Sequence, residues 1–320
     1  MASSEAVTAA HSDSLPHDVR LVAHEIRFRR RHHEILKGIS LELEPGRCLG
    51  IAGPNAAGKS TLLGTLAGWL HPSEGHVELN GRHLHGGVPP EVGFAAQEVS
   101  VYPHLTGREN LKLFGELYDL DRQPLERRID ELVDRFELEP WIDHEAVHYS
   151  GGVARRLHLC IALINSPQVL LLDEPTTGLD PSSRRNLLGN VVDLLQDGVS
   201  VVMTSQLLGD LEVVAHRLMV IVDGRRELYA DTDELVAQLG AATLYVELAQ
   251  HHGNGVDLDG VPGVISWKVE PNAVIARLAD TVAPLHAVLE RLARRGLHAA
   301  RIEVQPPSLE QMLKELVPDL

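Results

Sequence analysis

A glycine-rich octapeptide is the most chemically specific segment of the sequence. Gly53-Pro54-Asn55-Ala56-Ala57-Gly58-Lys59-Ser60 matches G-x-x-x-x-G-K-[ST], and it lies between the apolar run 49–52 and a helix-compatible segment that begins at Thr61. In such a loop the backbone N–H groups face phosphates, the lysine reaches the terminal phosphates and the serine hydroxyl binds magnesium. We therefore predict a nucleotide-phosphate site made of Gly53, Asn55, Ala56, Ala57, Gly58, Lys59, Ser60 and Thr61.

Two adjacent carboxylates form a second candidate group. Asp173 and Glu174 follow the apolar run 169–172, and the carboxyl ends of buried strands in α/β sheets carry ligand-binding residues. An acid at that point can hold magnesium through water, and its neighbour can orient or deprotonate an attacking water. Beside a phosphate loop, the pair predicts nucleotide hydrolysis, with Asp173 as a metal ligand and Glu174 as the base.

The elements that position these groups form an α/β fold. Apolar runs at 49–52, 169–172 and 199–203 alternate with helical patterns, which is typical of a mostly parallel sheet buried on both faces. Helical spacing at 109–118 and 125–136 indicates a helical insertion at about 98–150. After residue 231 an alternating strand at 243–248, an amphipathic helix at 283–295, a strand at 300–304 and a last helix at 308–316 predict a small C-terminal α+β domain over 231–320.

Composition limits the possible partners and compartment. The 320 residues carry a formal net charge of −16, which argues against broad attraction to nucleic acid or anionic lipid. Residues 1–18 are polar and small, and we expect a flexible tail there, followed by a nucleotide-binding domain over 19–230. Two isolated cysteines suit a reducing compartment, and no apolar run approaches the roughly 20 residues that cross a bilayer. We expect a cytoplasmic chain that reaches a membrane only through a partner subunit.

With these residues in place, the chain resembles the ATP-binding-cassette ATPases over about residues 19–228. Pro54-Asn55 and the run Leu172-Asp173-Glu174-Pro175-Thr176-Thr177-Gly178-Leu179-Asp180 are specific to that family. The resemblance implies the P-loop NTPase fold of the cassette type, ATP and Mg²⁺ as ligands, and a homodimer or heterodimer in which each ATP lies between two subunits. It also implies a membrane-spanning permease partner, which would hold the chain at the inner face of the cell membrane.

Site residues follow from the same resemblance. Ser150, Gly151 and Gly152 match the signature segment that contacts the partner subunit's ATP, and Asp180 matches the aspartate that links the two sites. Gln97 matches the glutamine loop that senses magnesium, so the implied metal ligands are Ser60, Gln97 and Asp173. Phe28 is the candidate for the aromatic residue that stacks on adenine, with His32 and His33 as neighbouring alternatives.

Three positions depart from the family pattern. Ala56 replaces a glycine, which the loop tolerates if position 56 does not need a positive φ. Tyr149 and Val153 replace the leucine and glutamine of the signature. Gln206 stands where relatives have a histidine at the γ-phosphate, and a neutral amide makes a weaker contact than a cation. We therefore expect slow ATP hydrolysis, with Glu174, Gln206 and Gln97 as the catalytic residues.

The C-terminal segment 305–316 and the stretch 101–111 resemble bacterial drug- and sodium-export ATPases, which favours an exporter. One alternative is an ATP-dependent clamp or regulatory subunit with little hydrolysis. Another is a soluble family member acting on ribosomes or DNA, which the single cassette and the negative charge disfavour. His83, His85, His251 and His252 lack spaced carboxylates or cysteines along the chain, so we assign no metal beyond magnesium.

Overall fold

The structure is a computed structural model that describes residues 19–239, 242–249, 256–280 and 283–305, together with Glu310, Leu313 and Val317. The tail predicted over residues 1–18 lies outside the described residues. Of the final helix predicted over 308–316, only Glu310 and Leu313 are described, and both are helical.

A six-stranded sheet forms the centre of the nucleotide-binding part. Its strands are β3 (Cys48–Ala52), β6 (Val92–Ala95), β7 (Val169–Asp173), β8 (Ser200–Ser205), β9 (Arg217–Val222) and β10 (Arg225–Asp231). They lie in the order β10-β9-β3-β8-β7-β6, and every neighbouring pair is parallel except the β9–β10 hairpin. Every residue of β3, β7 and β8 is buried. The mostly parallel sheet that the apolar runs predicted is confirmed.

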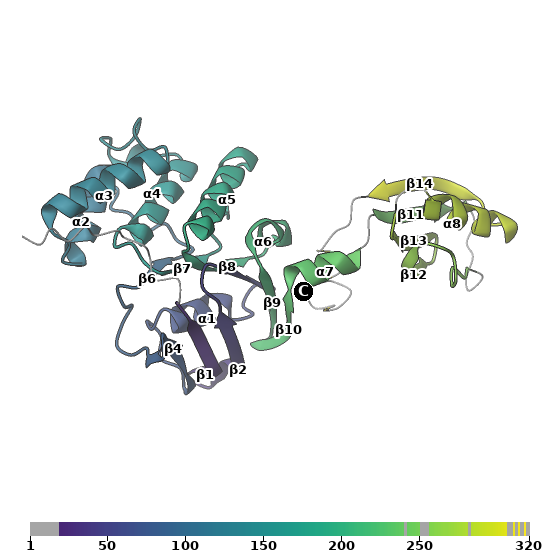
Figure 1. Cartoon of the computed structure of the whole chain (residues 1–320), viewed down its shortest axis with the longest axis horizontal. Helices are drawn as coiled ribbons and strands as arrows, with labels where there is room; N and C mark the ends of the chain where they lie inside the picture. Colours follow the sequence, from purple (N-terminus) through teal and green to yellow (C-terminus); the bar gives the residue numbers. More distant parts are fainter. Residues whose placement is uncertain are drawn as a thin grey trace, which may run out of the picture.

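The central sheet is buried because both of its faces are covered. Leu170 and Leu172 of β7 belong to a core cluster with residues of α4 (Gly151–Leu163), α5 (Pro181–Gln196) and α6 (Leu208–Val214). The alternate residues Val169 and Leu171 belong to a second cluster that includes α1 (Lys59–Leu66). Figure 1 shows α4 and α5 on one side of β7 and β8 and α1 on the other.

An antiparallel sheet that the sequence analysis did not predict also contributes to the second cluster. Its strands are β1 (Leu21–Arg30), β2 (His33–Leu43), β4 (Glu74–Leu79) and β5 (Arg82–His83), in the order β2-β1-β4-β5. Leu21 and Ala23 point into the core, as do Val77 and Leu79 on β4. The sheet therefore has one buried face and one that carries polar side chains.

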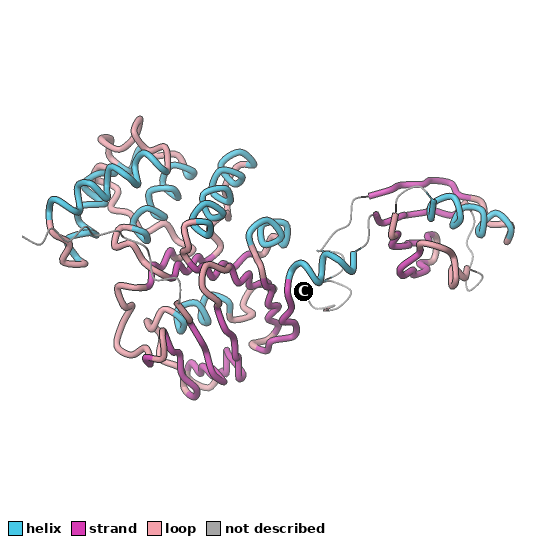
Figure 2. The backbone as a smooth tube through the Cα atoms, viewed as in Figure 1, coloured by secondary structure: helices cyan, strands magenta, loops and turns pink. Residues whose placement is uncertain are grey.

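The segment between β6 and β7 is helical. It contains α2 (Gly107–Leu117), α3 (Arg122–Arg135) and the short 3-10 helix η1 (Ala146–His148), and it leads into α4. Helix α2 begins with a capping box, in which the Thr106 hydroxyl accepts from the Glu109 N–H and the Glu109 carboxylate accepts from the Thr106 N–H. The helices gather at one end of the molecule in Figure 2.

The C-terminal part follows α7 (Thr232–Leu239) and has its own core. β11 (Ala242–Leu248), β12 (Val264–Glu270), β13 (Ala273–Leu278) and β14 (Ala299–Gln305) form an antiparallel sheet in the order β12-β13-β11-β14. Helix α8 (Ala283–Arg294) contributes Val288 and Leu292 to that core. The sequence analysis identified β11, α8 and β14 but missed β12 and β13.

The last described residues do not join that C-terminal core. Leu313 is fully buried and Val317 nearly so, and both belong to the core cluster of the central sheet, together with Leu235. The sequence analysis had grouped these residues with the C-terminal domain over 231–320.

None of the helices that the structure describes combines the length and the apolar character that a membrane-spanning helix requires.

Candidate functional site

The phosphate-loop segment connects β3 to α1 at the carboxyl edge of the central sheet. A Cβ at Gly53 would lie 2.2 Å from the carbonyl oxygen of Ile221, so only glycine fits there. The loop lines one cleft together with residues from other elements. The loop and the start of α1 contribute Asn55, Ala56, Ala57, Gly58, Lys59, Ser60 and Thr61. The remaining lining residues are His33, Glu34, Ile35, Lys37, Gln97, Glu174 and Asp223.

The loop takes an unfavourable backbone conformation at its substituted position. Ala56 has a φ of 64°, in the left-handed region, where an L-residue with a side chain is disfavoured by roughly 1–2 kcal/mol. The sequence analysis made the tolerance of Ala56 conditional on a position that does not need a positive φ, and that condition is not met. The loop keeps the conformation that a glycine would adopt, and Ala56 carries the strain.

Lys59 is held at the base of the cleft. Its Nζ donates to the carbonyl oxygens of Gly53 (2.8 Å) and Pro54 (3.1 Å), and it lies 3.5 Å from Oε1 of Glu174. The side chain is buried at 5% exposure. The ammonium is thus fixed between the phosphate loop and the end of β7.

One hydroxyl links Asp173 and Glu174, at the end of β7, to the neighbouring strand. Thr204 Oγ1 of β8 donates to Oδ1 of Asp173 (2.7 Å) and accepts from the backbone N–H of Glu174 (2.9 Å). Both acids are buried. Glu174 has a φ of 45°, and left-handed backbone at a non-glycine residue is a strain that occurs at functional sites.

Gln206 follows β8 and contacts Glu174 directly. Its Nε2 donates to both carboxylate oxygens of Glu174 at 2.9 Å each. Thr177 Oγ1 also donates to Oε2 of Glu174 (3.1 Å). The structure therefore brings the substituted position 206 to the same carboxylate that contacts Lys59.

Gln97 reaches the cleft at the end of β6 and is exposed. Its loop is tied to α4, because Arg155 donates to the carbonyl oxygens of Ala96 (3.2 Å) and Gln97 (2.8 Å). Burial lowers the pKa of the Arg155 guanidinium, and the Asp173 carboxylate opposes that shift. Helix α4, which begins at the signature segment, is thus connected to the glutamine loop.

Several predicted residues do not line this cleft. Ser150 caps the N-terminus of α4, where its Oγ accepts from the Val153 N–H (3.4 Å) and Gly151 and Gly152 form the first turn. Asp180 caps α5, where its carboxylate accepts from the Ser182 hydroxyl (2.6 Å) and from the N–H groups of Ser182 and Ser183. Hydrogen bonds from the side chains of Ser182 and Ser183, with smaller contributions from the N–H groups, hold the pKa of its carboxyl well below the usual range. None of these four residues lines the cleft.

Phe28 also lies elsewhere. Its half-buried side chain packs against the core cluster between the two sheets, whereas His33, one of the two alternatives, lines the cleft. Phe28 pairs with Leu36 in the β1–β2 ladder. Its assignment as the adenine-stacking residue has no support from its position in this structure.

Sequence reasoning missed the residues that brace the site. Thr204 and Arg155 act through contacts between elements that are distant in the chain. A buried network also joins the loop after β7 to α5 and α6, in which Asp210 accepts from Thr176 Oγ1 (2.5 Å) and pairs with Arg184. Such bracing residues are recognised as polar side chains at buried positions. The sequence does not show which positions are buried, so it gave no signal for them.

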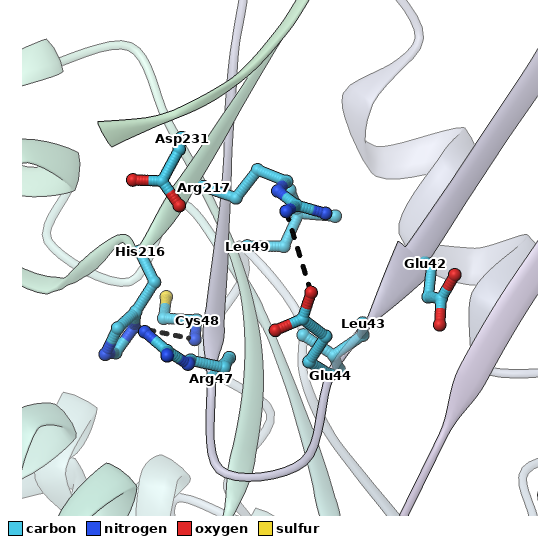
Figure 3. Close-up of a pocket in the computed structure, with 9 residues that line it drawn as sticks. All are labelled: Glu42, Leu43, Glu44, Arg47, Cys48, Leu49, His216, Arg217 and Asp231. Carbon is cyan, nitrogen blue, oxygen red and sulfur yellow. Dashed lines mark hydrogen bonds and ion pairs between the residues drawn. The ribbon is translucent and has the colours of Figure 1, made fainter. Parts of the chain in front are cut away.

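A separate small pocket lies at the opposite edge of the central sheet, where β3 begins. Figure 3 shows its lining from the turn before β3 and from β9 and β10, including Arg47, Cys48, His216 and Arg217. His216 Nδ1 accepts from the Cys48 N–H (3.1 Å), and Arg217 lies 3.6 Å from Glu44. No phosphate-loop residue lines this pocket.

Comparison with known proteins identifies the family. The ABC transporter family profile matches residues 36–177. The daunorubicin resistance ATP-binding protein DrrA3 of Streptomyces coeruleorubidus is 34% identical, covering 89% of this chain and 91% of that protein. The linearmycin resistance ATP-binding protein LnrL of Bacillus subtilis is 31% identical over 92% and 97% of the two chains. The Nod factor export ATP-binding protein I of Sinorhizobium fredii is 32% identical over 88% and 81%.

Solved structures agree on the fold. The ATP-binding subunit of an ABC transporter matches with a TM-score of 0.62 at 24% identity, over 68% of this chain and 92% of that one. A dimeric ATP-binding cassette bound to ADP and phosphate matches with a TM-score of 0.61 at 24% identity, over 66% and 98%. At this identity the likeness shows the fold alone, which is that of an ATP-binding cassette.

The fold and the phosphate loop define an ATP-binding P-loop protein of the cassette type. The chain belongs to the ABC transporter ATP-binding family, and it is the ATP-binding subunit of such a transporter.

Proposed function

We propose that the chain hydrolyses ATP in a head-to-tail dimer and that dimer closure drives export through a separate membrane-spanning permease. Relatives named for drug resistance and for Nod factor export support the exporter direction. In this proposal the chain is cytoplasmic and is held at the inner face of the membrane by the permease. We propose no nucleic-acid partner, given the net charge of −16.

The observation that carries the hydrolytic proposal is the position of Glu174. Its buried carboxylate lies 3.5 Å from the ammonium of Lys59, at the cleft lined by the phosphate loop. A carboxylate at that point can accept a proton from water that attacks the terminal phosphate. Its bonds with Gln206 and Thr177 keep it oriented.

The donor set formed by two residues that line the cleft and by Asp173, which directly precedes the lining residue Glu174, fits magnesium. Ser60, Gln97 and Asp173 offer hydroxyl, amide and carboxylate oxygens, which are the hard ligands that Mg²⁺ prefers. Bound there with ATP, the ion would neutralise charge on the phosphates. Thr204 orients Asp173 for this role through its hydrogen bond to Oδ1.

The predicted ATP-contacting residues that lie away from the cleft support a dimer, because they could contact a nucleotide held by a second subunit. Ser150, Gly151 and Gly152 form an exposed or half-exposed helix N-terminus, a geometry that favours anions. In a head-to-tail dimer this turn would face the γ-phosphate held by the other subunit. Asp180, at the start of α5, would lie near the same junction.

We further propose that turnover is slow. Gln206 can donate only a neutral hydrogen bond, and neutral contacts are about half as strong as charge-assisted ones. The clamp alternative, in which ATP closes the dimer without hydrolysis, shares this feature, but the presence of Glu174 beside Lys59 supports a catalytic role.

Glu174→Gln is the test. Turnover is expected to fall on the order of a hundredfold, while ATP affinity is kept and the ATP-bound dimer becomes easier to isolate by gel filtration. Glu212→Gln is the matched control, because Glu212 is an exposed carboxylate on α6. Equal turnover in wild type and Glu174→Gln would reject the base assignment. Wild type that dimerises with ATP but does not hydrolyse it, even with the permease, would favour the clamp.

A further inference from the structure

The outer face of the antiparallel sheet carries a cluster of imidazoles and one carboxylate. His24 of β1 lies directly opposite His76 of β4, and Glu78 of β4 lies directly opposite His83 of β5. Residues two apart on a strand share a face, so His76 and Glu78 point the same way. Val77 and Leu79 point to the buried core instead. Strand pairing therefore collects four polar side chains from three strands.

The functional atoms of this cluster are close together. One ligand atom from each of His24, His76 and Glu78 lies within 4.8 Å of the others. His76 Nε2 is 3.1 Å from Oε1 of Glu78, and His83 Nε2 is 3.0 Å from the same oxygen. The rings of His76 and His83 are stacked, with centroids 4.3 Å apart and planes 5° from parallel.

Such spacing is close to that around a tetrahedral ion. Zinc binds histidine nitrogen and carboxylate oxygen at about 2.0–2.2 Å, which separates its ligand atoms by roughly 3.3–3.6 Å. The His76–Glu78 pair is already near that separation. The side chains of His76, Glu78 and His83 are 39%, 26% and 47% exposed, so they have room for the remaining adjustment.

We propose that His24, His76 and Glu78 form a binding site for a divalent first-row transition ion of the zinc type, with water completing the coordination. His83 acts as a positioning residue that orients the Glu78 carboxylate, as outer-shell partners do at metal sites. The sequence analysis assigned no metal to the histidines because it considered neighbours along the chain, whereas these ligands meet through strand pairing.

This site is chemically separate from the nucleotide site. None of its residues lines the phosphate-loop cleft. Imidazole nitrogen suits zinc, copper and nickel, whereas Mg²⁺ takes oxygen ligands. An excess of magnesium, such as ATPase assays contain, is therefore expected to leave zinc binding unchanged. Because the ligands come from β1 and β4, the bound ion would cross-link two strands of the folded sheet.

Calorimetry of the full, nucleotide-free chain without a polyhistidine tag tests the site, with Zn²⁺ as the probe and Mg²⁺ in excess. His24→Ala/His76→Ala is expected to weaken the tightest zinc binding by roughly a hundredfold or more, since loss of an outer-shell partner alone weakens metal affinity about 10–100-fold. The matched control is His144→Ala/His298→Ala, which removes two exposed histidines outside the cluster. Equal affinity in both double variants, or no zinc binding in the presence of Mg²⁺, would overturn the proposal.

A second variant keeps the test independent of folding. Glu78→Gln retains the size of the side chain but removes its charge, and we expect at least tenfold weaker zinc binding with an unchanged circular dichroism spectrum. Zinc should also raise the melting temperature of wild type and not that of Glu78→Gln at matched concentration. Zinc affinity and zinc-induced stabilisation that do not differ between these proteins would remove Glu78 from the ligand set.

Discussion

Replacing His158 with glutamine is expected to flatten the pH dependence of the chain's stability below pH 7. His158 lies on α4 at 3% exposure, and its Nδ1 has no hydrogen-bond partner among the described residues. Burial, together with the nearby Arg155 cation, lowers the pKa of His158 from 6.5 to about 4. Both causes act against the charged imidazolium, because a second cation would be placed in a dry interior.

The direction of the effect follows from proton binding. Between pH 6.5 and about 4 the unfolded chain protonates His158 and the folded chain does not. Above pH 6.5 His158 is neutral in both states and does not reduce the free energy of unfolding. As the pH falls from 6.5 toward 4, proton binding to the unfolded chain lowers the free energy of unfolding. Between pH 7 and pH 5 this linkage lowers the free energy of unfolding by roughly 2 kcal/mol.

Urea denaturation at pH 7, 6 and 5 measures the effect. Glutamine does not titrate, so the loss of stability from pH 7 to pH 5 should be smaller in His158→Gln than in wild type by roughly 2 kcal/mol. His144→Gln serves as the control, because His144 is exposed and its replacement should leave the wild-type pH dependence unchanged. Carboxylates that titrate in this range are common to all three proteins. Parallel pH curves for wild type and His158→Gln would refute the buried, neutral assignment.

Three further substitutions test the nucleotide site. Ala56→Gly should raise the free energy of unfolding by about 0.5–1 kcal/mol, because relief of the left-handed strain exceeds the added entropy of the unfolded chain. Ala57→Gly is the control and should lower the free energy of unfolding. A lower free energy of unfolding in Ala56→Gly would contradict the assignment of strain to Ala56. Arg155→Met should slow ATP turnover with little change in ATP affinity, since the guanidinium holds the loop of Gln97, and it should destabilise the chain by roughly 1.5–3 kcal/mol. Arg156→Met, which removes a bond to the Phe136 carbonyl instead, is its control for turnover. Gln206→His should increase ATP turnover about tenfold, equivalent to one restored contact of roughly 1.4 kcal/mol, and an equal or lower rate would mean that the site is adapted to glutamine.

Local sequence determined the parts of the site that one continuous segment builds. The phosphate loop requires glycines, a lysine and a hydroxyl at fixed spacing, so its presence between β3 and α1 was predictable from residues 53–60. The strands β3, β7 and β8 were equally clear, because burial on both faces makes them continuously apolar. The family and the ATP-binding role followed from these segments, and the comparisons confirmed both.

Contacts between distant segments were decided only by the tertiary structure. Nothing local to Arg155 indicates that it binds the carbonyls beside Gln97, and nothing local to Thr204 indicates that it bridges Asp173 and Glu174. Strands β1, β2 and β4 have one polar face, so their apolar residues alternate and do not form a clear run. The positive φ of Ala56 is likewise imposed by the surrounding loop, since an alanine alone favours ordinary backbone. The sequence thus determined the functional residues that one continuous segment carries at fixed spacing. Which side chains orient those residues was decided by the packing of strands and helices that are distant along the chain.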